Sequence, residues 1–181
     1  MAAVRGCCLF DTAIGACGIA WTDDALAAVQ LPETTRTGTR DRMLRHCGAV
    51  PETEPPPFVQ AAIARIRALL EGARDDLADV PLELEGVPEF HRKVYAVARS
   101  IPPGEVLTYG EVAKRLGEPG ASRAVGQALG HNPFAPVVPC HRVLAAGGRP
   151  GGFSAEGGAH TKLRMLEIEK ARFGGEPGLF D

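Results

Sequence analysis

The chain has 181 residues, a net charge of −2 and 45% hydrophobic residues, which is typical of a folded globular protein and excludes a largely disordered one. No apolar run approaches the length that crosses a membrane, and the first residues lack the apolar stretch and cleavage site of a signal peptide, so we expect a soluble, cytoplasmic protein. The five cysteines are odd in number and irregularly spaced, which argues against a disulfide framework.

The first elements along the chain are predicted to be strands followed by helices. Short apolar runs broken by turn residues predict strands within residues 6–22 and 25–33, joined tightly into an antiparallel meander. Helices are predicted over residues 39–49 and 55–72, and in the second of them apolar residues recur at helical spacing. A further strand and a linker are predicted over residues 80–90.

Three N-terminal cysteines, Cys7, Cys8 and Cys17, are the only plausible donors for a structural metal site. No CxxC or HxxxH pair accompanies them, so a zinc site has little support. The alternative, small apolar residues packed on strands, fits the pattern better. We therefore predict no metal.

Charge is distributed unevenly on the two sides of a domain boundary, which we place near Pro88 in the predicted linker. Residues 1–89 carry eight basic and 14 acidic residues, whereas residues 90–172 carry 12 basic and six acidic residues. The second half is thus a candidate for a polyanionic partner, although a solvated basic surface explains the charge equally well. A helix follows the boundary, with one apolar face formed by Phe90, Val94, Val97 and Ile101.

Two short helices come next and form a helix-turn-helix candidate. Thr108 and Glu111, three residues apart, make a capping-box pattern that starts the first helix, and Gly117 is placed to end it. After a tight turn containing proline and glycine, the second helix is predicted over residues 121–131.

The second of these helices is nearly bare of large side chains. Gly126 lies in its interior, where a glycine costs about 1 kcal/mol relative to alanine, so its presence needs a reason. Tight packing against another helix is one explanation. Close approach of nucleic acid is the other, with Arg123 as the one long side chain that could enter a narrow groove.

Cys140 lies in the apolar run of residues 137–144, which predicts a short buried strand or strand-like loop. Neighbours on a strand point to opposite faces, so His141 would reach the thiol only through a water or a bent backbone. A lone buried cysteine is more often a packing residue. The basic neighbours, which favour the thiolate, and the nearby helix-turn-helix instead favour a nucleophile that meets DNA.

The run "TYGEVAKRLGEPGASRAVGQALGHNPFAPVVPCHRVL" closely resembles the O6-alkylguanine-DNA alkyltransferase family, the methylated-DNA–protein-cysteine methyltransferases. The resemblance covers about residues 88–172 and rests on a composite of motifs: Tyr109, "RAVG" at 123–126, "NP" at 132–133, "PCHRV" at 139–143, and the segment from Lys162 to Glu169. Residues 1–87 are loosely similar to the family's ribonuclease-H-like N-terminal domain. The resemblance implies an α+β fold, with that domain, a mostly helical DNA-binding alkyltransferase domain at 88–173, and a tail at 174–181.

The resemblance also implies the catalytic residues. Cys140 is the nucleophile that takes the alkyl group from O6 of guanine, His141 contacts it through a water, and Glu169 orients His141. Asn132 braces the turn between the recognition helix and the active-site loop. Tyr109 reaches the flipped nucleotide, and its hydroxyl assists as guanine leaves. The thioether product is not hydrolysed by water, so the protein acts only once. The resemblance also implies that it acts as a monomer and without a cofactor.

The implied DNA-binding residues lie on the bare helix and around the base. Arg123 fills the gap that the flipped base leaves in double-stranded DNA, and Ser122, Ala124 and Gly126 share its minor-groove face. The main chain at Val143 and Ser154 binds the edges of the base, in a pocket that also includes Pro139 and Phe153. O4-alkylthymine is a further candidate substrate.

This sequence departs from the family pattern at two places. In "GGFSAEGG" (151–158), Phe153 replaces a tyrosine, and Ala155 and Glu156 look inserted. A roomier loop predicts tolerance of bulkier adducts, whereas a bulge into solvent would leave the pocket unchanged. Ala135 stands where the family often has proline.

Three other classes compete with this interpretation. The main alternative is a non-enzymatic sensor that flips alkylated bases, but such relatives lack the cysteine. A cysteine hydrolase needs an oxyanion-hole motif, and the chain offers none. A transcriptional regulator needs base-reading side chains on its recognition helix, in which this helix is poor.

Overall fold

The first half of the chain is built on a three-stranded antiparallel sheet. The computed structural model describes residues 2–149 and 158–172 of the chain. The strands are β1 (Gly6–Thr12), β2 (Gly15–Trp21) and β3 (Leu26–Gln30), in the order β1-β2-β3. Gly15, at φ 123°, allows the tight turn between the first two strands, since this region favours glycine. The predicted meander is confirmed.

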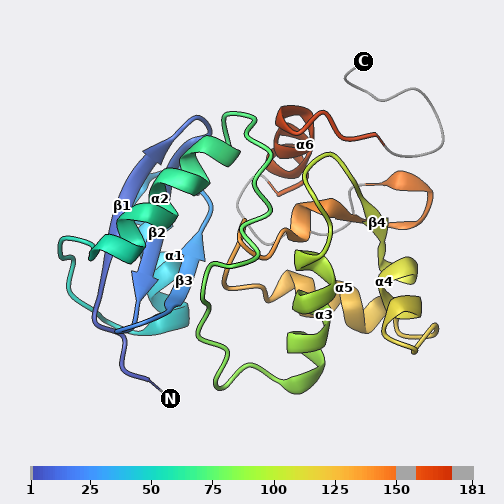
Figure 1. The fold of residues 1–181 in the computed structure, drawn as a ribbon, viewed down its shortest axis with the longest axis horizontal. Helices are drawn as coiled ribbons and strands as arrows, with labels where there is room; N and C mark the ends of the chain where they lie inside the picture. The colour runs from blue at the N-terminus through green and yellow to red at the C-terminus, as the bar shows by residue number, and fades with distance from the viewer. Residues whose placement is uncertain (1, 150–157, 173–181) are drawn as a thin grey trace.

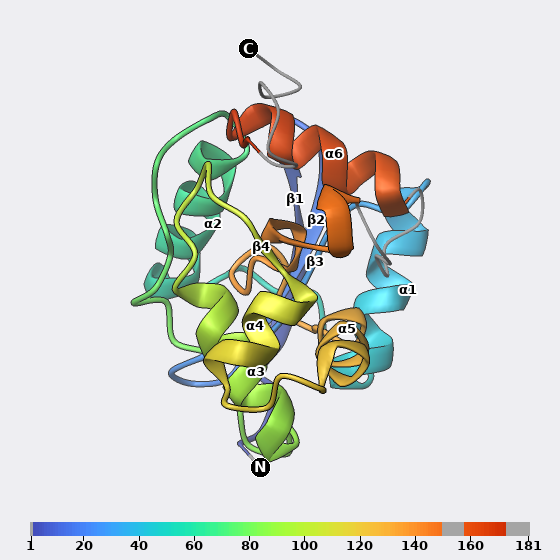
Figure 2. The same ribbon diagram turned by 90° about the vertical axis from the view of Figure 1, so that its right-hand side faces the viewer.

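One helix covers each face of this sheet, as Figure 1 and Figure 2 show. Successive strand residues point to opposite faces, so Ile19 and Ala20 belong to different clusters. Ile19 packs in the cluster that includes the apolar face of α2 (Pro57–Leu69). Ala20 packs in a second cluster with Met43 of α1 (Arg36–Cys47). Both predicted helices are confirmed.

The second half is mostly helical. Its helices are α3 (Glu89–Arg99), α4 (Tyr109–Arg115), α5 (Ser122–Gly130) and α6 (Gly158–Ile168). A two-stranded parallel sheet joins β4 (Leu107–Thr108) to β5 (Val143–Leu144). Val94, Val112 and Val125, one from each of α3, α4 and α5, are fully buried in one core. The fold is thus mixed α and β.

Local signals start and stop α4 as predicted. The Thr108 hydroxyl accepts a hydrogen bond from the Glu111 N–H at 3.1 Å, and the Glu111 carboxylate accepts one from the Thr108 N–H at 3.1 Å. Gly117 has φ 76°, a left-handed conformation that ends helices. The short turn that follows leads into α5, which packs against α4.

The segment between α5 and β5 joins the two halves. The Val29 N–H of β3 donates to the Pro133 carbonyl at 2.8 Å, so residues 133–134 complete the edge of the N-terminal sheet. Val137 and Met165 lie in the N-terminal core cluster rather than in the helical one. The segment that carries Cys140 is therefore fixed from both sides.

The strand predicted from Val80 is wrong. Residues 80–86 form only an isolated parallel bridge between Leu82 and Leu26. The Leu26 N–H donates to the Pro81 carbonyl, and the Glu83 N–H donates to the Leu26 carbonyl. Pro81 has no N–H to extend the pairing, and Gly86 turns the chain at φ 87°. No helix within residues 2–149 and 158–172 is long and apolar enough to span a membrane.

Candidate active site

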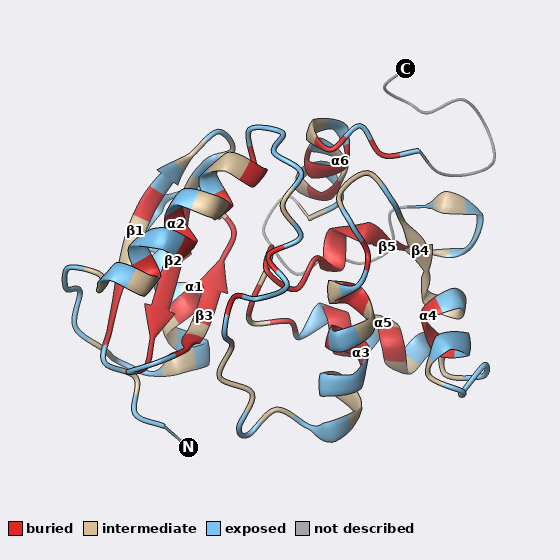
Figure 3. Cartoon of the chain, viewed as in Figure 1, coloured by how far each residue is buried: buried red, intermediate tan, exposed pale blue. Residues whose placement is uncertain are grey.

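Cys140 lies in a single turn of 3₁₀ helix, η1 (Cys140–Arg142), and not on the predicted strand. Only Val143 and Leu144 are extended and pair with β4. Pro139 breaks the extended run because it donates no hydrogen bond, and the Arg142 N–H instead donates back to the Pro139 carbonyl at 2.9 Å. The chain leading into β5 is buried from Pro136 to Leu144 (Figure 3). Cys140 itself is 5% exposed.

Asn132 lies where it was expected, in the turn after α5. Its side-chain amide donates to the Val138 carbonyl at 2.9 Å, and its side-chain oxygen accepts from the Phe134 N–H at 2.9 Å. The Asn132 side chain also acts on the Cys140 thiol, whose pKa it lowers. Asn132 thus ties the end of α5 to the cysteine turn.

His141 and Glu169 meet in the interior, 28 positions apart in the sequence. His141 Nε2 is 2.7 Å from Glu169 Oε1, and both side chains are buried. Burial lowers the pKa of His141, and the cations Arg142 and Lys162 act in the same direction, against Glu169. The ring is therefore neutral near pH 7. Because an ionised carboxylate only accepts, Nε2 carries the proton, and Nδ1 is left as an acceptor.

The buried Nδ1 of His141 has no hydrogen-bond partner among the residues that the structure describes. Buried polar atoms without a hydrogen-bond partner are uncommon in folded proteins. Where one occurs, a functional role is one explanation. Here it leaves a neutral imidazole with one unused basic nitrogen beside the cysteine turn, which is the arrangement a proton acceptor requires.

Arg142 is a site residue that the sequence analysis did not identify. Its Nη2 donates to Glu169 Oε1 at 2.8 Å and its Nε to Oε2 at 3.0 Å, while Nη1 donates to the Ile101 carbonyl at 2.7 Å. The side chain is 1% exposed, and a buried arginine requires such partners. The signal in the sequence was an arginine within an apolar run. The sequence does not say which glutamate pairs with it.

Lys162 is the second residue whose role was not predicted. It projects from α6, is 1% exposed, and places Nζ 5.7 Å from the centroid of the Tyr109 ring. Burial lowers the pKa of Lys162 to about 8, while the charge of Cys140 raises it. The ammonium therefore faces the cysteine and tyrosine together.

Burial raises the pKa of the Cys140 thiol above its ordinary value. The Asn132 side chain, Lys162 and the main-chain N–H groups of Cys140 and His141 act in the opposite direction but do not outweigh burial. A cationic neighbour, Lys162, thus favours the thiolate as expected, but the desolvation of the sulfur outweighs it. A proton acceptor is needed to activate it.

The exposed face of α5 carries the remaining predicted residues. Arg123 is exposed and makes no hydrogen bond or ion pair with the described part of the chain. Ser122, Ala124 and Gly126 are half-buried. A Cβ added at Gly126 would lie 3.9 Å from the Tyr109 ring, an ordinary contact distance. Tight packing within the chain therefore does not require this glycine.

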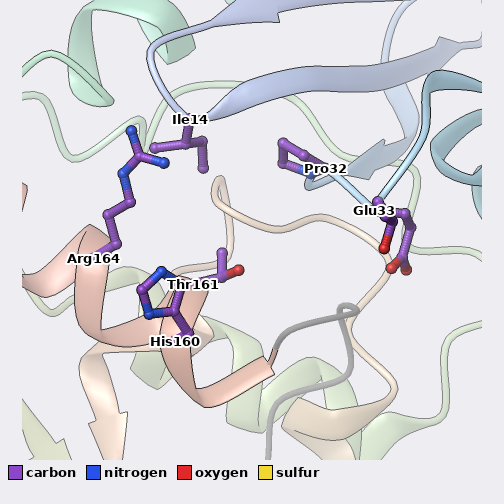
Figure 4. A pocket seen from close by; sticks show the side chains of 7 residues that line it. Ile14, Pro32, Glu33, His160, Thr161 and Arg164 are labelled. Atoms are coloured by element: carbon purple, nitrogen blue, oxygen red, sulfur yellow. The ribbon is translucent and has the colours of Figure 1, made fainter.

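Two of the predicted pocket residues, Val143 and Pro139, are buried beside Cys140. Phe153 and Ser154, with the loop at residues 150–157, lie outside the described residues. A separate cavity of about 230 Å³ lies between α6 and the sheet, where His160, Thr161 and Arg164 face Ile14 and Pro32 (Figure 4). None of the residues around Cys140 lines it. No cluster of metal-binding side chains occurs within residues 2–149 and 158–172.

Comparison with known proteins gives one consistent result. The family model described as 6-O-methylguanine DNA methyltransferase, DNA binding domain, matches residues 89–171. The methylated-DNA–protein-cysteine methyltransferase of Mycobacterium bovis is 36% identical over 171 residues, covering 94% of this chain and 96% of its own. The protein of the same name from Methanothermobacter thermautotrophicus is 36% identical over 159 residues, covering 88% and 82%. The crystal structure of Mycobacterium tuberculosis OGT in complex with DNA has a TM-score of 0.73 at 35% identity, covering 97% and 99%.

Proposed function

The chain belongs to the methylated-DNA–protein-cysteine methyltransferase family, and we propose that it repairs DNA by transferring an alkyl group from O6 of guanine to the Cys140 thiol. The carbon–sulfur bond formed is a thioether, which water does not hydrolyse. Each molecule therefore acts once. The reaction requires a nucleophilic sulfur, a proton acceptor and a proton donor for the departing base.

The neutral His141, with Nε2 bound to Glu169 and Nδ1 unused, is the observation that carries this proposal. His141 takes the thiol proton at Nδ1 through one water, and Glu169 stabilises the imidazolium that forms. The sulfur attacks the alkyl carbon, and the electron pair of the carbon–oxygen bond stays on guanine. Tyr109 donates a proton to the base, and the proton on His141 returns through solvent to Tyr109.

DNA contact is assigned to α5, which lies in the minor groove. The target carbon is inside the duplex, so the base must be flipped out at a cost of a few kcal/mol. Arg123, exposed and unpaired within the described residues, occupies the gap in the stack, with Ser122 and Ala124 beside it. Gly126 keeps this face of α5 free of a side chain beside the Tyr109 ring, so that DNA can approach the helix closely.

The flipped base enters a pocket walled by Pro139 and Phe153, and the main chain at Val143 and Ser154 binds its edges. The protein acts as a monomer. We also assign a ribonuclease-H-like topology to residues 1–87 and the alkyltransferase domain to residues 88–173. Two helices covering opposite faces of an antiparallel sheet support the first of these assignments.

One experiment with two substrates tests the function and the flipping step together. Wild-type protein incubated with duplex DNA containing O6-methylguanine should gain one methyl group on the Cys140 peptide, measured by mass spectrometry. Cys140→Ser should gain none while its affinity for DNA stays within several-fold. Arg123→Ala should react slowly with the duplex but at the wild-type rate with free O6-benzylguanine, which needs no flipping.

Unmodified wild-type protein that still binds the damaged duplex would identify a sensor and overturn the transfer proposal. Modification of another cysteine would remove Cys140 from its role. If Arg123→Ala slowed the duplex and the free base equally, Arg123 would support the fold rather than the flipped state.

A further inference from the structure

The end of α6, where Glu169 lies, is held by an arginine from the first half of the chain. Arg74 Nη1 donates to the Glu169 carbonyl at 2.9 Å and to the Pro103 carbonyl at 3.1 Å. Gly72, two residues before it, also approaches this helix end, since a Cβ there would lie 3.8 Å from the Ile168 carbonyl oxygen. The turn at residues 72–74 therefore rests against the last turn of α6.

This helix end needs external support. Lys170 has φ 54°, a left-handed conformation that is unfavourable for a residue other than glycine. The Lys170 N–H donates to the Glu167 carbonyl and the Ala171 N–H to the Leu166 carbonyl, each at 3.0 Å, which closes the helix in a Schellman motif. That motif does not use the Glu169 carbonyl. Arg74 supplies a cationic donor to it, at the negative end of the helix dipole.

Residues 101–104 anchor this arginine and Arg142 at the same time. Arg142 donates to the Ile101 carbonyl, and Arg74 donates to the Pro103 carbonyl. A Cβ at Gly104 would lie 2.6 Å from Arg74 Nη1, so the glycine leaves space for the guanidinium. Glu169 thus accepts hydrogen bonds from two arginines: from Arg142 at its carboxylate and from Arg74 at its main-chain carbonyl.

We propose that Arg74 is a positioning residue for alkyl transfer: it fixes the main chain of Glu169 from the N-terminal half, so that the carboxylate stays in line with His141 Nε2. The inference rests on the proposed function, since it makes the first half of the chain contribute to the reactivity of Cys140. Arg74 itself is exposed and touches none of the reacting atoms.

The test follows the reactivity of the sulfur as a function of pH in the full chain. Modification of the Cys140 peptide by iodoacetamide is measured by mass spectrometry for wild type and Arg74→Ala. Loosening Glu169 weakens His141 as a proton acceptor, so the apparent pKa of the thiol should rise by about half a unit and the rate at pH 7 should fall about threefold. At high pH, where the thiol ionises without help, the two rates should converge.

Two further variants separate positioning from general loosening. Arg67→Ala is the matched control, because Arg67 is exposed and donates to the Asp11 carbonyl rather than to the Glu169 carbonyl. Arg67→Ala should leave the pH dependence of Cys140 modification unchanged. In a His141→Gln background the effect of Arg74→Ala should vanish, because the two changes act through the same pair.

A rate reduced equally at every pH, or a full additional loss in the His141→Gln background, would overturn the positioning role. Since iodoacetamide requires neither DNA nor an alkylated base, this result is independent of the transfer assay. A wild type that fails to take methyl from DNA contradicts the proposed function, whereas an unshifted Arg74→Ala profile contradicts only this inference.

Discussion

The balance of charge around one sulfur decides what the site can do. Cys140 is desolvated, which alone would keep it a thiol at neutral pH. His141 can remove the proton only if it is neutral, and burial together with Arg142 and Lys162 keeps it so. The site therefore combines a thiol that needs activation with an imidazole that is ready to accept a proton.

Lys162 is expected to stabilise the thiolate by charge. Replacing it in Lys162→Met keeps the length of the side chain but removes the cation near Cys140, so the pKa of the thiol should rise by about one unit and the rate at pH 7 should fall roughly tenfold. The measurement is the rate of reaction with O6-benzylguanine from pH 6 to 9. Because burial lowers the pKa of Lys162 to about 8, the difference from wild type should shrink above that pH.

Lys114→Met, on the exposed face of α4, is the control and should react at the wild-type rate. Removing a buried ammonium should leave the free energy of unfolding unchanged or higher. An unchanged rate for Lys162→Met at pH 7 would show that its charge does not act on the sulfur.

At the scale of elements, α5 is less stable as a helix than it could be, because its surface is formed largely by alanine and glycine. Gly126 weakens the helix, yet nothing within the described residues crowds the position that a Cβ would take. The explanation by helix packing therefore loses its support. Close approach of DNA is the explanation that we propose for this glycine.

Gly126→Ala should accordingly stabilise the protein and impair its function. The free energy of unfolding in urea should rise by about 1 kcal/mol, since alanine is the better helix former and the Tyr109 ring is 3.9 Å away. Repair of duplex DNA should slow. Gln127→Ala, one residue on and exposed, should leave repair unchanged. Equal repair rates for Gly126→Ala and wild type would mean that DNA does not approach this position.

At the scale of the whole molecule, residues from both halves of the chain form hydrogen bonds with Glu169. Its carboxylate is bound by His141 and Arg142, and its carbonyl by Arg74. Burial raises the pKa of Glu169, but the charges and hydrogen bonds of His141 and Arg142 outweigh it and hold the pKa at about 2. The fold therefore depends on this carboxylate being ionised.

Acid should remove that contribution in a defined range. Above the ordinary value of 4.5 the group is ionised in both the folded and the unfolded chain, and its stabilisation is complete. As the pH falls from 4.5 towards 2, the unfolded chain binds the proton first, and about 3 kcal/mol is lost. Urea unfolding of wild type and Glu169→Gln from pH 7 to pH 2.5 should show a gap that narrows in this range. A constant gap would contradict the lowered pKa.

Short-range patterns predicted most of the elements. The capping box of Thr108 and Glu111, the short apolar runs of β1 and β2, and the apolar spacing of α2 depend on neighbours within a few residues, so the sequence reveals them directly. The family motifs also predicted which residues gather around Cys140, and the contacts of Asn132, His141 and Glu169 agree with that arrangement.

Only the tertiary structure decided the rest, because those features depend on partners far apart in the sequence. The 3₁₀ turn at Cys140 replaces a strand since Pro139 and the packing of both halves override an apolar run that is locally compatible with either. The pairing of Arg142 with Glu169, and of Arg74 with the same residue, spans 27 and 95 positions. Burial and these distant partners together then set the pKa values, and no local pattern encodes how deeply a side chain is removed from water.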